Sequence, residues 1–340
     1  MGEKCVLILE PEYYRKADLE RLKAAGYRPV LKECATQKEL FAEFKRLRDE
    51  GKSVEAIFVK LGLSFDRELF YACGGELKFL VTPTTGLNHI DQDELECLGI
   101  KLISLKGETA FLREITPTAE LVFALLLALL RMVPQALSHV LAGYWQRRGL
   151  VGRELKELTL GVVGLGRLGT MVAGYGRVFG MPVIAYDLKD EPFQRQENIH
   201  VERKDTLGEL VAEADVVSIH LPWDEDTAGL FDEDLFKQFK QGAYLVNTAR
   251  GEIIDEAALL KALKEDVLAG CAIDVLHGDS RWAERVPEGH PLVEYAREHD
   301  NLIITPHIGG YTVKAIQKTR TFMVDKFLAA LGDKGVFDDS

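Results

Sequence analysis

Short apolar runs alternate with polar, helix-periodic segments along nearly the whole chain. In the first third, apolar runs occur at residues 5–10, 27–32, 54–59, 77–81 and 101–105, and amphipathic helical segments at 16–25 and 38–49. Regular alternation of strand and helix predicts a parallel sheet with helices on both faces. We therefore expect the first third of the chain to form a doubly wound α/β domain.

The alternation restarts after a strongly apolar helical segment at 116–131. Six further apolar runs follow, at residues 159–163, 182–186, 216–220, 243–247, 270–275 and 302–305, with helical patterns at 256–265 and 313–331. About six strands are the number of a complete dinucleotide-binding sheet. A chain of 340 residues is also too long for one ordinary core, so two domains are expected.

Glycines follow the first strand of this second sheet in a regular pattern. Gly164, Gly166 and Gly169 form a G-x-G-x-x-G directly after an apolar run and before a helical segment. The first glycine permits a tight turn, the second lets the backbone approach a pyrophosphate, and the third lets the helix pack on the strand. In this context the motif predicts a dinucleotide site.

An acidic residue, Asp187, closes the next predicted strand. A carboxylate at that place binds the adenosine ribose hydroxyls and repels a 2′-phosphate. The sequence therefore predicts NAD as the cofactor, although Lys189, two residues further on, leaves some tolerance of NADP open.

Three charged residues stand at the ends of later predicted strands. Arg250 follows the run at 243–247, Asp274 lies in the run at 270–275, and His307 follows the run at 302–305. The carboxyl edge of an open parallel sheet lines the ligand crevice. Each residue alone could be a surface charge or part of a turn, but together with the glycine motif they predict a dehydrogenase site.

With these motifs, the chain resembles the D-isomer-specific 2-hydroxyacid dehydrogenase family. The resemblance covers nearly the whole chain. Its motifs are the glycine fingerprint, His220–Pro222, Asn247–Gly251 with Asp255 and Glu256, Thr305–His307, and Thr85–Asp91.

The resemblance implies an α/β fold of two doubly wound parallel-sheet domains, with a Rossmann cofactor domain inserted into a flavodoxin-like substrate domain. Residues 1–113 and 311–340 would form the discontinuous substrate domain, and residues 114–310 the NAD-binding domain. Relatives bind the substrate carboxylate through backbone amides of the loop that here contains Thr85 and Gly86.

By the same resemblance, Arg250 clamps the substrate and His307 is the general acid for reduction and the base for oxidation. In relatives, a glutamate at the fifth position after the residue equivalent to Asp274 pairs with this histidine and favours its imidazolium. Here that position is Asp279, which is shorter by one methylene. Whether Asp279 replaces the glutamate fully is open.

Further residues match positions that line the cofactor cleft of relatives, and Asp274 matches the residue that holds the nicotinamide carboxamide. The expected cofactor-binding residues are Gly164, Gly166, Arg167, Leu168, Gly169, Asp187, His220, Leu221, Pro222, Thr227, Thr248, Ala249, Arg250, Asp274, His307 and Gly309. We expect no metal, because a hydride carrier removes the need for one.

Composition limits the partners. The net charge of −12 argues against nucleic acid and anionic membrane, and the apolar run at 119–130 is too short to span a bilayer. Five scattered cysteines without paired spacing are expected to be reduced and mostly buried, as in a cytoplasmic protein. The apolar circumference of the helix at 116–131 suggests a homodimer.

Two alternatives stay open. One is an NAD(H)-sensing binding protein or co-repressor on the same fold, which the retained Arg250 and His307 disfavour. The other is formate or phosphite oxidation, which the carboxylate at Asp279 disfavours, because formate enzymes of the family have glutamine there. The sequence does not identify the 2-hydroxy acid or the direction of reaction, nor does it assign a role to the segment at 280–300.

Overall fold

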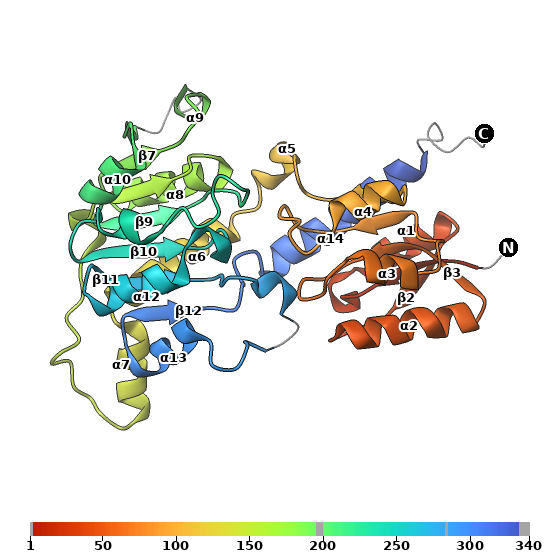
Figure 1. Cartoon of the computed structure of the whole chain (residues 1–340), viewed down its shortest axis with the longest axis horizontal. Helices are drawn as coiled ribbons and strands as arrows, with labels where there is room; N and C mark the ends of the chain where they lie inside the picture. Colours follow the sequence, from red (N-terminus) through yellow and green to blue (C-terminus); the bar gives the residue numbers. More distant parts are fainter. Residues whose placement is uncertain (1–2, 195–199, 283–284, 333–340) are drawn as a thin grey trace. The chain divides into compact units, whose positions relative to one another are not determined.

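The computed structural model describes residues 3–194, 200–282 and 285–332 of the chain. These residues form two compact units (Figure 1). The first unit holds the residues up to Leu112, those from Thr312 onward and the short segment Ser280–Val286. The second unit holds Arg113–Asp279 and Pro287–Tyr311.

The first unit is built on a five-stranded parallel sheet in the order β2-β1-β3-β4-β5. Its strands are β1 (Glu3–Ile8), β2 (Arg28–Leu31), β3 (Lys52–Phe58), β4 (Phe79–Val81) and β5 (Lys101–Ile103). Its helices are α1 (Lys16–Ala24), α2 (Gln37–Asp49), α3 (Arg67–Ala72), α4 (Gln92–Cys97), α5 (Thr109–Leu112) and α14 (Val313–Gly332). This order is that of flavodoxin-like sheets, so the predicted class of this domain is confirmed.

The last helix, α14, packs into the unit of the N-terminal strands. Phe327 is fully buried and makes edge-to-face contacts with Tyr27, Phe58 and Phe79, at centroid distances of 5.4, 5.5 and 5.3 Å. Phe111 stacks on Phe322 of the same helix at 3.9 Å. The two ends of the chain therefore share one hydrophobic core.

The second unit contains a seven-stranded parallel sheet in the order β12-β11-β10-β9-β6-β7-β8. Its strands are β6 (Leu160–Val163), β7 (Val183–Tyr186), β8 (Glu202–Arg203), β9 (Val216–Ile219), β10 (Ala243–Asn247), β11 (Leu268–Ile273) and β12 (Leu302–Ile304). Six of the seven lie at the predicted runs. The seventh, β8, consists of two exposed residues that pair with β7, and the pattern of apolar runs does not reveal it.

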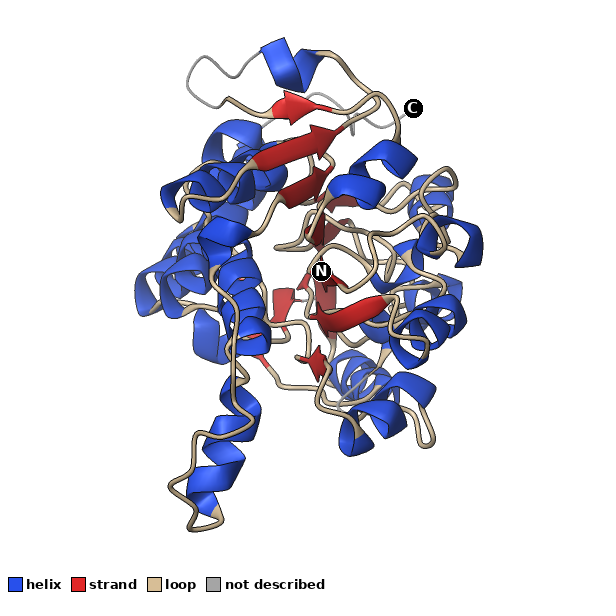
Figure 2. Cartoon of the chain, turned by 90° about the vertical axis from the view of Figure 1, so that its left-hand side faces the viewer, coloured by secondary structure: helices blue, strands red, loops and turns tan. Residues whose placement is uncertain are grey.

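Helices cover both faces of this sheet; strands are red and helices blue in Figure 2. They are α6 (Pro117–Leu130), α7 (Val133–Leu141), α8 (Arg167–Val178), α9 (Glu191–Gln194), α10 (Leu207–Glu213), α11 (Glu233–Phe236), α12 (Glu256–Lys264) and α13 (Pro291–Glu298). Within the described residues, no single helix is long and apolar enough to cross a membrane. Only the bent pair Thr109–Leu130 and Val133–Leu141 reaches that length together.

The apolar helix α6 is buried in its own unit. Val122, Phe123 and Leu126 belong to the core that also contains strands β6 and β7, while Leu125 and Leu129 pack against Ala272 of β11. Its apolar circumference therefore reflects packing inside the unit and does not by itself argue for a partner subunit.

Exposed apolar side chains gather instead on α7 and the loop after it, which extend beyond the rest of their unit in both views (Figures 1 and 2). The exposed members of this group are Val133, Leu137, Val140, Leu141, Tyr144 and Trp145. The side chain of Trp145 is 93% exposed.

The cysteines are as expected: all five are free, four are buried and Cys97 is exposed. Burial raises the pKa of the Cys34 thiol to about 11, with the Glu43 carboxylate adding to the effect, and that of Cys73 to about 12. These two thiols are held in their protonated, unreactive form.

Candidate active site

The glycine fingerprint forms the turn between β6 and α8. Gly164 has a φ of +87°, which favours glycine, and a Cβ at Gly169 would lie 1.9 Å from the carbonyl oxygen of Gly164. Gly166 is the N-cap of α8, and a Cβ there would meet nothing within 4 Å. Two glycines are thus needed for the turn and for helix packing, whereas Gly166 leaves space above the first amides of α8.

Asp187 lies directly after β7, beside this turn. Its Oδ2 accepts a hydrogen bond of 2.7 Å from the Leu165 amide, and its Oδ1 one of 2.9 Å from the Lys189 amide. These bonds fix the carboxylate next to the glycine turn. Arg167, at the start of α8, donates from Nη1 to the Ile115 carbonyl at 2.9 Å, and burial lowers the pKa of its guanidinium. Leu168 packs against the core of the same unit.

Three neighbouring strands of the second unit carry the remaining candidates. Asn247 of β10 is aligned with Ile273 of β11, which is aligned with Ile304 of β12. Arg250, Asp274 and His307 follow the ends of these three strands. The predicted catalytic residues of this unit therefore lie along one stretch of its carboxyl edge.

Asp274 is 1% exposed and organises the loop that carries His307. Its Oδ1 accepts from Thr305 Oγ1 at 2.6 Å and from the Ile308 amide at 2.9 Å, and its Oδ2 accepts from the Gly309 amide at 2.7 Å. Its carbonyl oxygen accepts from the His307 amide at 2.9 Å. Burial raises the pKa of Asp274, and these hydrogen bonds oppose the shift.

His307 is held by these bonds in a left-handed backbone conformation, with a φ of +54°. A non-glycine residue adopts this region rarely, and only where its surroundings stabilise it. Its Nδ1 lies 2.9 Å from Asp279 Oδ2, and the two side chains are 27% and 12% exposed. The same carboxylate oxygen also accepts from the Leu276 amide at 3.3 Å.

Arg250 is the N-cap of the short 3-10 turn Gly251–Ile253. Its Nη1 donates to the Ala249 carbonyl at 2.6 Å. Burial lowers the pKa of the guanidinium, while the carboxylates of Asp279 and Glu252 oppose that shift. The group stays charged, because an arginine titrates far above neutral pH.

Polar atoms without a protein partner lie along the same edge. Thr248 Oγ1 and His220 Nδ1 are buried and have no hydrogen-bond partner among the described residues, whereas His220 Nε2 lies 2.8 Å from Ser218 Oγ. Burial lowers the pKa of His220 to about 3, so the ring is neutral. A bound polar ligand would satisfy both atoms.

The neighbouring residues of the predicted cleft take ordinary structural roles. Leu221 contacts the glycine turn, its Cδ2 lying 2.9 Å from the position of a Cβ on Gly164. Thr227 donates to the Pro222 carbonyl at 2.8 Å and closes the loop after β9.

The loop predicted to bind the substrate carboxylate follows β4 in the first unit. Thr82 and Thr84 share a hydrogen bond of 2.8 Å between their hydroxyls, and Thr84 donates to the Gly86 carbonyl at 2.8 Å. Thr85 is exposed. Hydrogen bonds of Thr82 and Thr84 thus fix the conformation of this loop.

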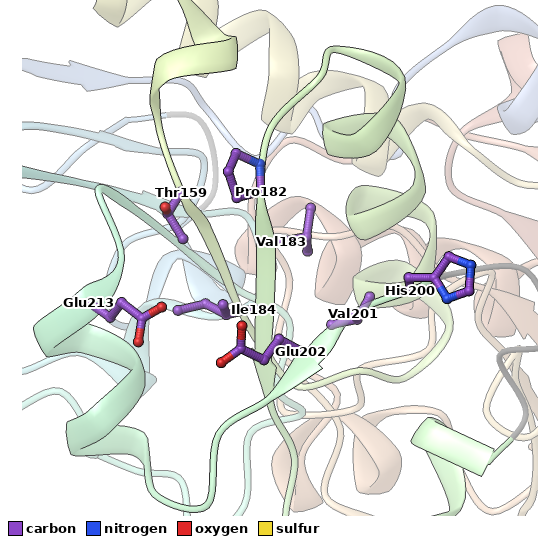
Figure 3. A pocket seen from close by; sticks show the side chains of 8 residues that line it. All are labelled: Thr159, Pro182, Val183, Ile184, His200, Val201, Glu202 and Glu213. Carbon is purple, nitrogen blue, oxygen red and sulfur yellow. The ribbon is translucent and has the colours of Figure 1, made fainter.

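A pocket of about 480 Å³ lies elsewhere in the second unit (Figure 3). It is lined by Thr159, Pro182, Val183, Ile184, His200, Val201, Glu202 and Glu213. Thr159 and Pro182 precede β6 and β7, so the pocket opens at the amino end of these strands. Lys204 pairs with both carboxylates, Glu202 and Glu213. None of the predicted site residues lines it.

Several residues that shape the site are not among those predicted from the sequence. Asn247 accepts from the Ala249 amide at 2.9 Å and donates to the Arg250 carbonyl at 2.8 Å, which fixes the turn that carries Arg250. An asparagine at the end of a strand is a known turn signal and could have indicated this role. Thr305, which donates to Asp274, lies in the Thr305–His307 motif, but the motif alone does not indicate this bond.

Comparison with known proteins extends these observations. Residues 123–309 match the "D-isomer specific 2-hydroxyacid dehydrogenase, NAD binding domain". A D-3-phosphoglycerate dehydrogenase of Bacillus subtilis is 35% identical over 78% of this chain and 47% of its own length, so the chain spans about half of that relative. A glyoxylate reductase of Thermofilum pendens is 32% identical over 84% of this chain and 80% of its own length.

A solved structure shows the same resemblance. D-lactate dehydrogenase from Aquifex aeolicus, in complex with NAD and lactic acid, aligns with a TM-score of 0.75 and 27% identity over 99% of this chain and all of its own. The motifs, the strand order of both sheets and these matches agree. The chain belongs to the D-isomer specific 2-hydroxyacid dehydrogenase family.

Proposed function

We propose that this protein transfers a hydride between NAD(H) and a small 2-keto or D-2-hydroxy carboxylate. The observation that carries the proposal is the contact of 2.9 Å between His307 Nδ1 and Asp279 Oδ2, on the same sheet edge as Arg250. A histidine oriented by a carboxylate is the usual form of a general acid–base group. The identity of the relatives supports the reaction class.

His307 would act through its second ring nitrogen. Because Asp279 binds Nδ1, the proton that moves is the one on Nε2. In reduction the imidazolium donates this proton to the developing alkoxide, and in oxidation the neutral ring removes it from the hydroxyl. In both steps the carboxylate of Asp279 would orient the ring through Nδ1.

Arg250 would bind the carboxylate and the reacting oxygen of the substrate. Its planar guanidinium has several donors, and the contact with the Ala249 carbonyl uses only part of them. In the first unit, the loop with Thr85 and Gly86 would offer backbone amides to the substrate carboxylate. Residues 1–113 and 311–340 would then form the substrate domain, and residues 114–310 the cofactor domain.

The second unit fits a dinucleotide. Several features lie on the carboxyl side of the sheet. They are the open space at Gly166, the fixed carboxylate of Asp187, and the atoms Thr248 Oγ1 and His220 Nδ1, which have no hydrogen-bond partner in the described part of the chain. When bound, the nicotinamide supplies or accepts the hydride. Asp274 would contribute through Oδ2, which accepts only one bond from the described residues.

The test of the reaction is a screen of NADH oxidation with glyoxylate, hydroxypyruvate, pyruvate and 3-phosphohydroxypyruvate. We expect turnover of at least one of these acids and formation of the D-isomer of the chiral products. NADH binding without turnover of any acid would favour a binding protein instead.

For the cofactor, we infer a preference for NAD(H) over NADP(H). The Asp187 carboxylate is held by two backbone amides, so it does not turn away easily from a 2′-phosphate. The values of kcat/KM with NADH and NADPH should differ in favour of NADH, and Asp187→Ser should narrow the difference. Equal use of both cofactors by the unmodified protein would contradict this role.

For the assembly, we infer a homodimer that buries the exposed apolar side chains of α7. An exposed group of this kind is uncommon on a monomer and usually marks an interface. Light scattering should give about twice the chain mass of 38.0 kDa, and Leu137→Glu with Leu141→Glu should reduce it to the monomer mass. A monomer mass for the unmodified protein at micromolar concentration would exclude the dimer.

A further inference from the structure

Two acidic side chains accept hydrogen bonds from the backbone of the loop that carries Asp279. The His277 amide donates to Glu256 Oε1 at 2.9 Å, and the Gly278 amide donates to Glu252 Oε1 at 3.3 Å. Both acids belong to the segment directly after Arg250. The backbone of the loop is therefore hydrogen-bonded to side chains of the segment that follows β10.

The two segments approach each other very closely. A Cβ on Gly251 would lie 2.1 Å from the carbonyl carbon of Leu276 and 2.4 Å from the amide nitrogen of His277. Only glycine permits this approach, because the atoms in the way are backbone. Gly251 brings the loop within reach of the carboxylates of Glu252 and Glu256.

Glu256 has a second partner. Its Oε2 lies 3.3 Å from His290 Nε2, and the two side chains are 22% and 9% exposed. His290 is the N-cap of α13, in the segment whose role the sequence left open. One oxygen of Glu256 thus faces the loop of Asp279, and the other faces the residue that begins α13.

We propose that Glu256 is a positioning residue that keeps the short carboxylate of Asp279 in contact with His307. Asp279 has a single methylene between its backbone and its carboxylate, so its reach depends on where the loop backbone lies. Glu256 holds that backbone at the amide of His277, two residues before Asp279. His290 keeps Glu256 turned toward the loop. The proposal rests on the proposed function of His307.

Three charged residues of the described part of the unit are linked to His307. Asp279 contacts Nδ1, and Arg250 interacts with Asp279. Asp274 follows the end of β11; burial raises the pKa of its carboxyl, and the charge of His307 opposes that shift. Glu256 acts through the position of Asp279 and does not contact the ring. Its loss should therefore resemble the loss of Asp279 in kind.

The experiment compares Glu256→Ala with Asp279→Asn in pH profiles of kcat/KM for keto-acid reduction. Both variants should lose activity mainly on the alkaline side, because the imidazolium is less stable without its anion. A displacement of the alkaline limb by about one pH unit lowers the rate there about tenfold. Glu256→Gln keeps an oxygen acceptor for the His277 amide and should retain the unmodified profile. Glu265→Ala, at the exposed end of the same helix, is the matched control.

Two further measurements separate positioning from a general structural effect. In the double variant Glu256→Ala, Asp279→Asn, the displacement should equal that of Asp279→Asn alone, because both changes break the same contact. NADH affinity, measured by fluorescence titration, should stay unchanged. His290→Ala should move the limb in the same direction by a smaller amount.

A readout without substrate keeps this proposal distinct from the proposed reaction. Correlation spectra of ¹⁵N-labelled histidine, assigned with His307→Gln, report whether the Nδ1 proton of His307 is held in a hydrogen bond. Glu256→Ala and Asp279→Asn should both weaken that signature, even if the panel of keto acids shows no turnover. An unmodified His307 signal in Glu256→Ala would overturn the proposal, as would additive displacements in the double variant.

Discussion

Buried charges have different partners in the two units, although both units are doubly wound parallel sheets. In the first unit, Asp18, Glu43, Glu55 and Arg320 are each less than 9% exposed, and each pairs with a side chain of opposite charge. Among the described residues of the second unit, the comparable residue is Asp274. Its hydrogen bonds come from a threonine hydroxyl and from backbone amides.

This difference separates two uses of buried charge. An ion pair such as Glu55 with Lys78, 3.2 Å apart, is satisfied within its own unit and stabilises it. Asp274 instead fixes the backbone of a loop, and the loop presents a titratable ring. Since the two folds are so similar, the chemistry depends on the residues at the strand ends and not on the architecture.

The largest effect should come from His307→Ala in the second unit. Removing the proton donor should lower kcat/KM for keto-acid reduction by about 10²–10⁴-fold. The free energy of unfolding should change little, because the side chain is partly exposed. His299→Gln, an exposed histidine of the same unit, serves as the control. Near-normal turnover in His307→Ala would mean that His307 is not the proton donor, and the chemical role proposed for the second unit would fail.

Arg250→Lys should have the next largest effect. Lysine keeps the charge but loses the planar pair of donors, so kcat/KM should fall about 10- to 100-fold, the equivalent of one or two charged hydrogen bonds. The contacts serve both the bound substrate and the transition state, so KM should rise while kcat falls. Steady-state kinetics with the best keto acid give both values. A change in kcat alone would mean that Arg250 does not hold the substrate before reaction.

In the first unit, Glu55→Ala should change stability and not rate. Glu55 accepts from Tyr27 at 3.0 Å and pairs with Lys78, so its removal leaves a buried hydroxyl unsatisfied. The free energy of unfolding should fall by about 1–3 kcal/mol. Glu55→Gln keeps an acceptor and should lose less. Urea unfolding and kcat/KM, measured on the same samples, test this prediction. An altered kcat/KM of the fully folded variant would contradict a purely stabilising role of Glu55.

The parts of the site that the sequence predicted depend on local requirements. The glycine turn is recognisable because a φ of +87° at Gly164 favours glycine, and because a Cβ at Gly169 would lie only 1.9 Å from the carbonyl oxygen of Gly164. Strands β6 to β12, apart from β8, were recognisable because buried parallel strands are continuous apolar runs. Each of these signals lies within about ten residues of sequence.

The parts that the sequence did not predict depend on contacts between distant segments. Glu256 accepts a hydrogen bond from the backbone amide of His277. Because almost every residue has such an amide, the sequence does not indicate which one a side chain binds. The segment Ser280–Val286 joins the first unit because Ser280 bonds Gly62 and Asn88, both far away in the chain. The apolar surface of α6 led to the prediction of a subunit contact, whereas elements of its own unit cover the helix. The periodicity of apolar residues shows that a helix is buried but not which elements bury it.

The smallest expected effect is a displacement in pH, produced by Asp279→Asn. The carboxylate lies 2.9 Å from His307 Nδ1 and stabilises the imidazolium. With asparagine the imidazolium loses its proton at lower pH, so the alkaline limb of reduction should move down by about one pH unit. Oxidation needs the neutral ring, so its acid limb should move down as well, and the variant should oxidise better than the unmodified protein at low pH. Asp279→Glu keeps a carboxylate and should keep both limbs in place. Profiles of both directions that are unchanged in Asp279→Asn would mean that this carboxylate orients the loop without affecting the proton on His307.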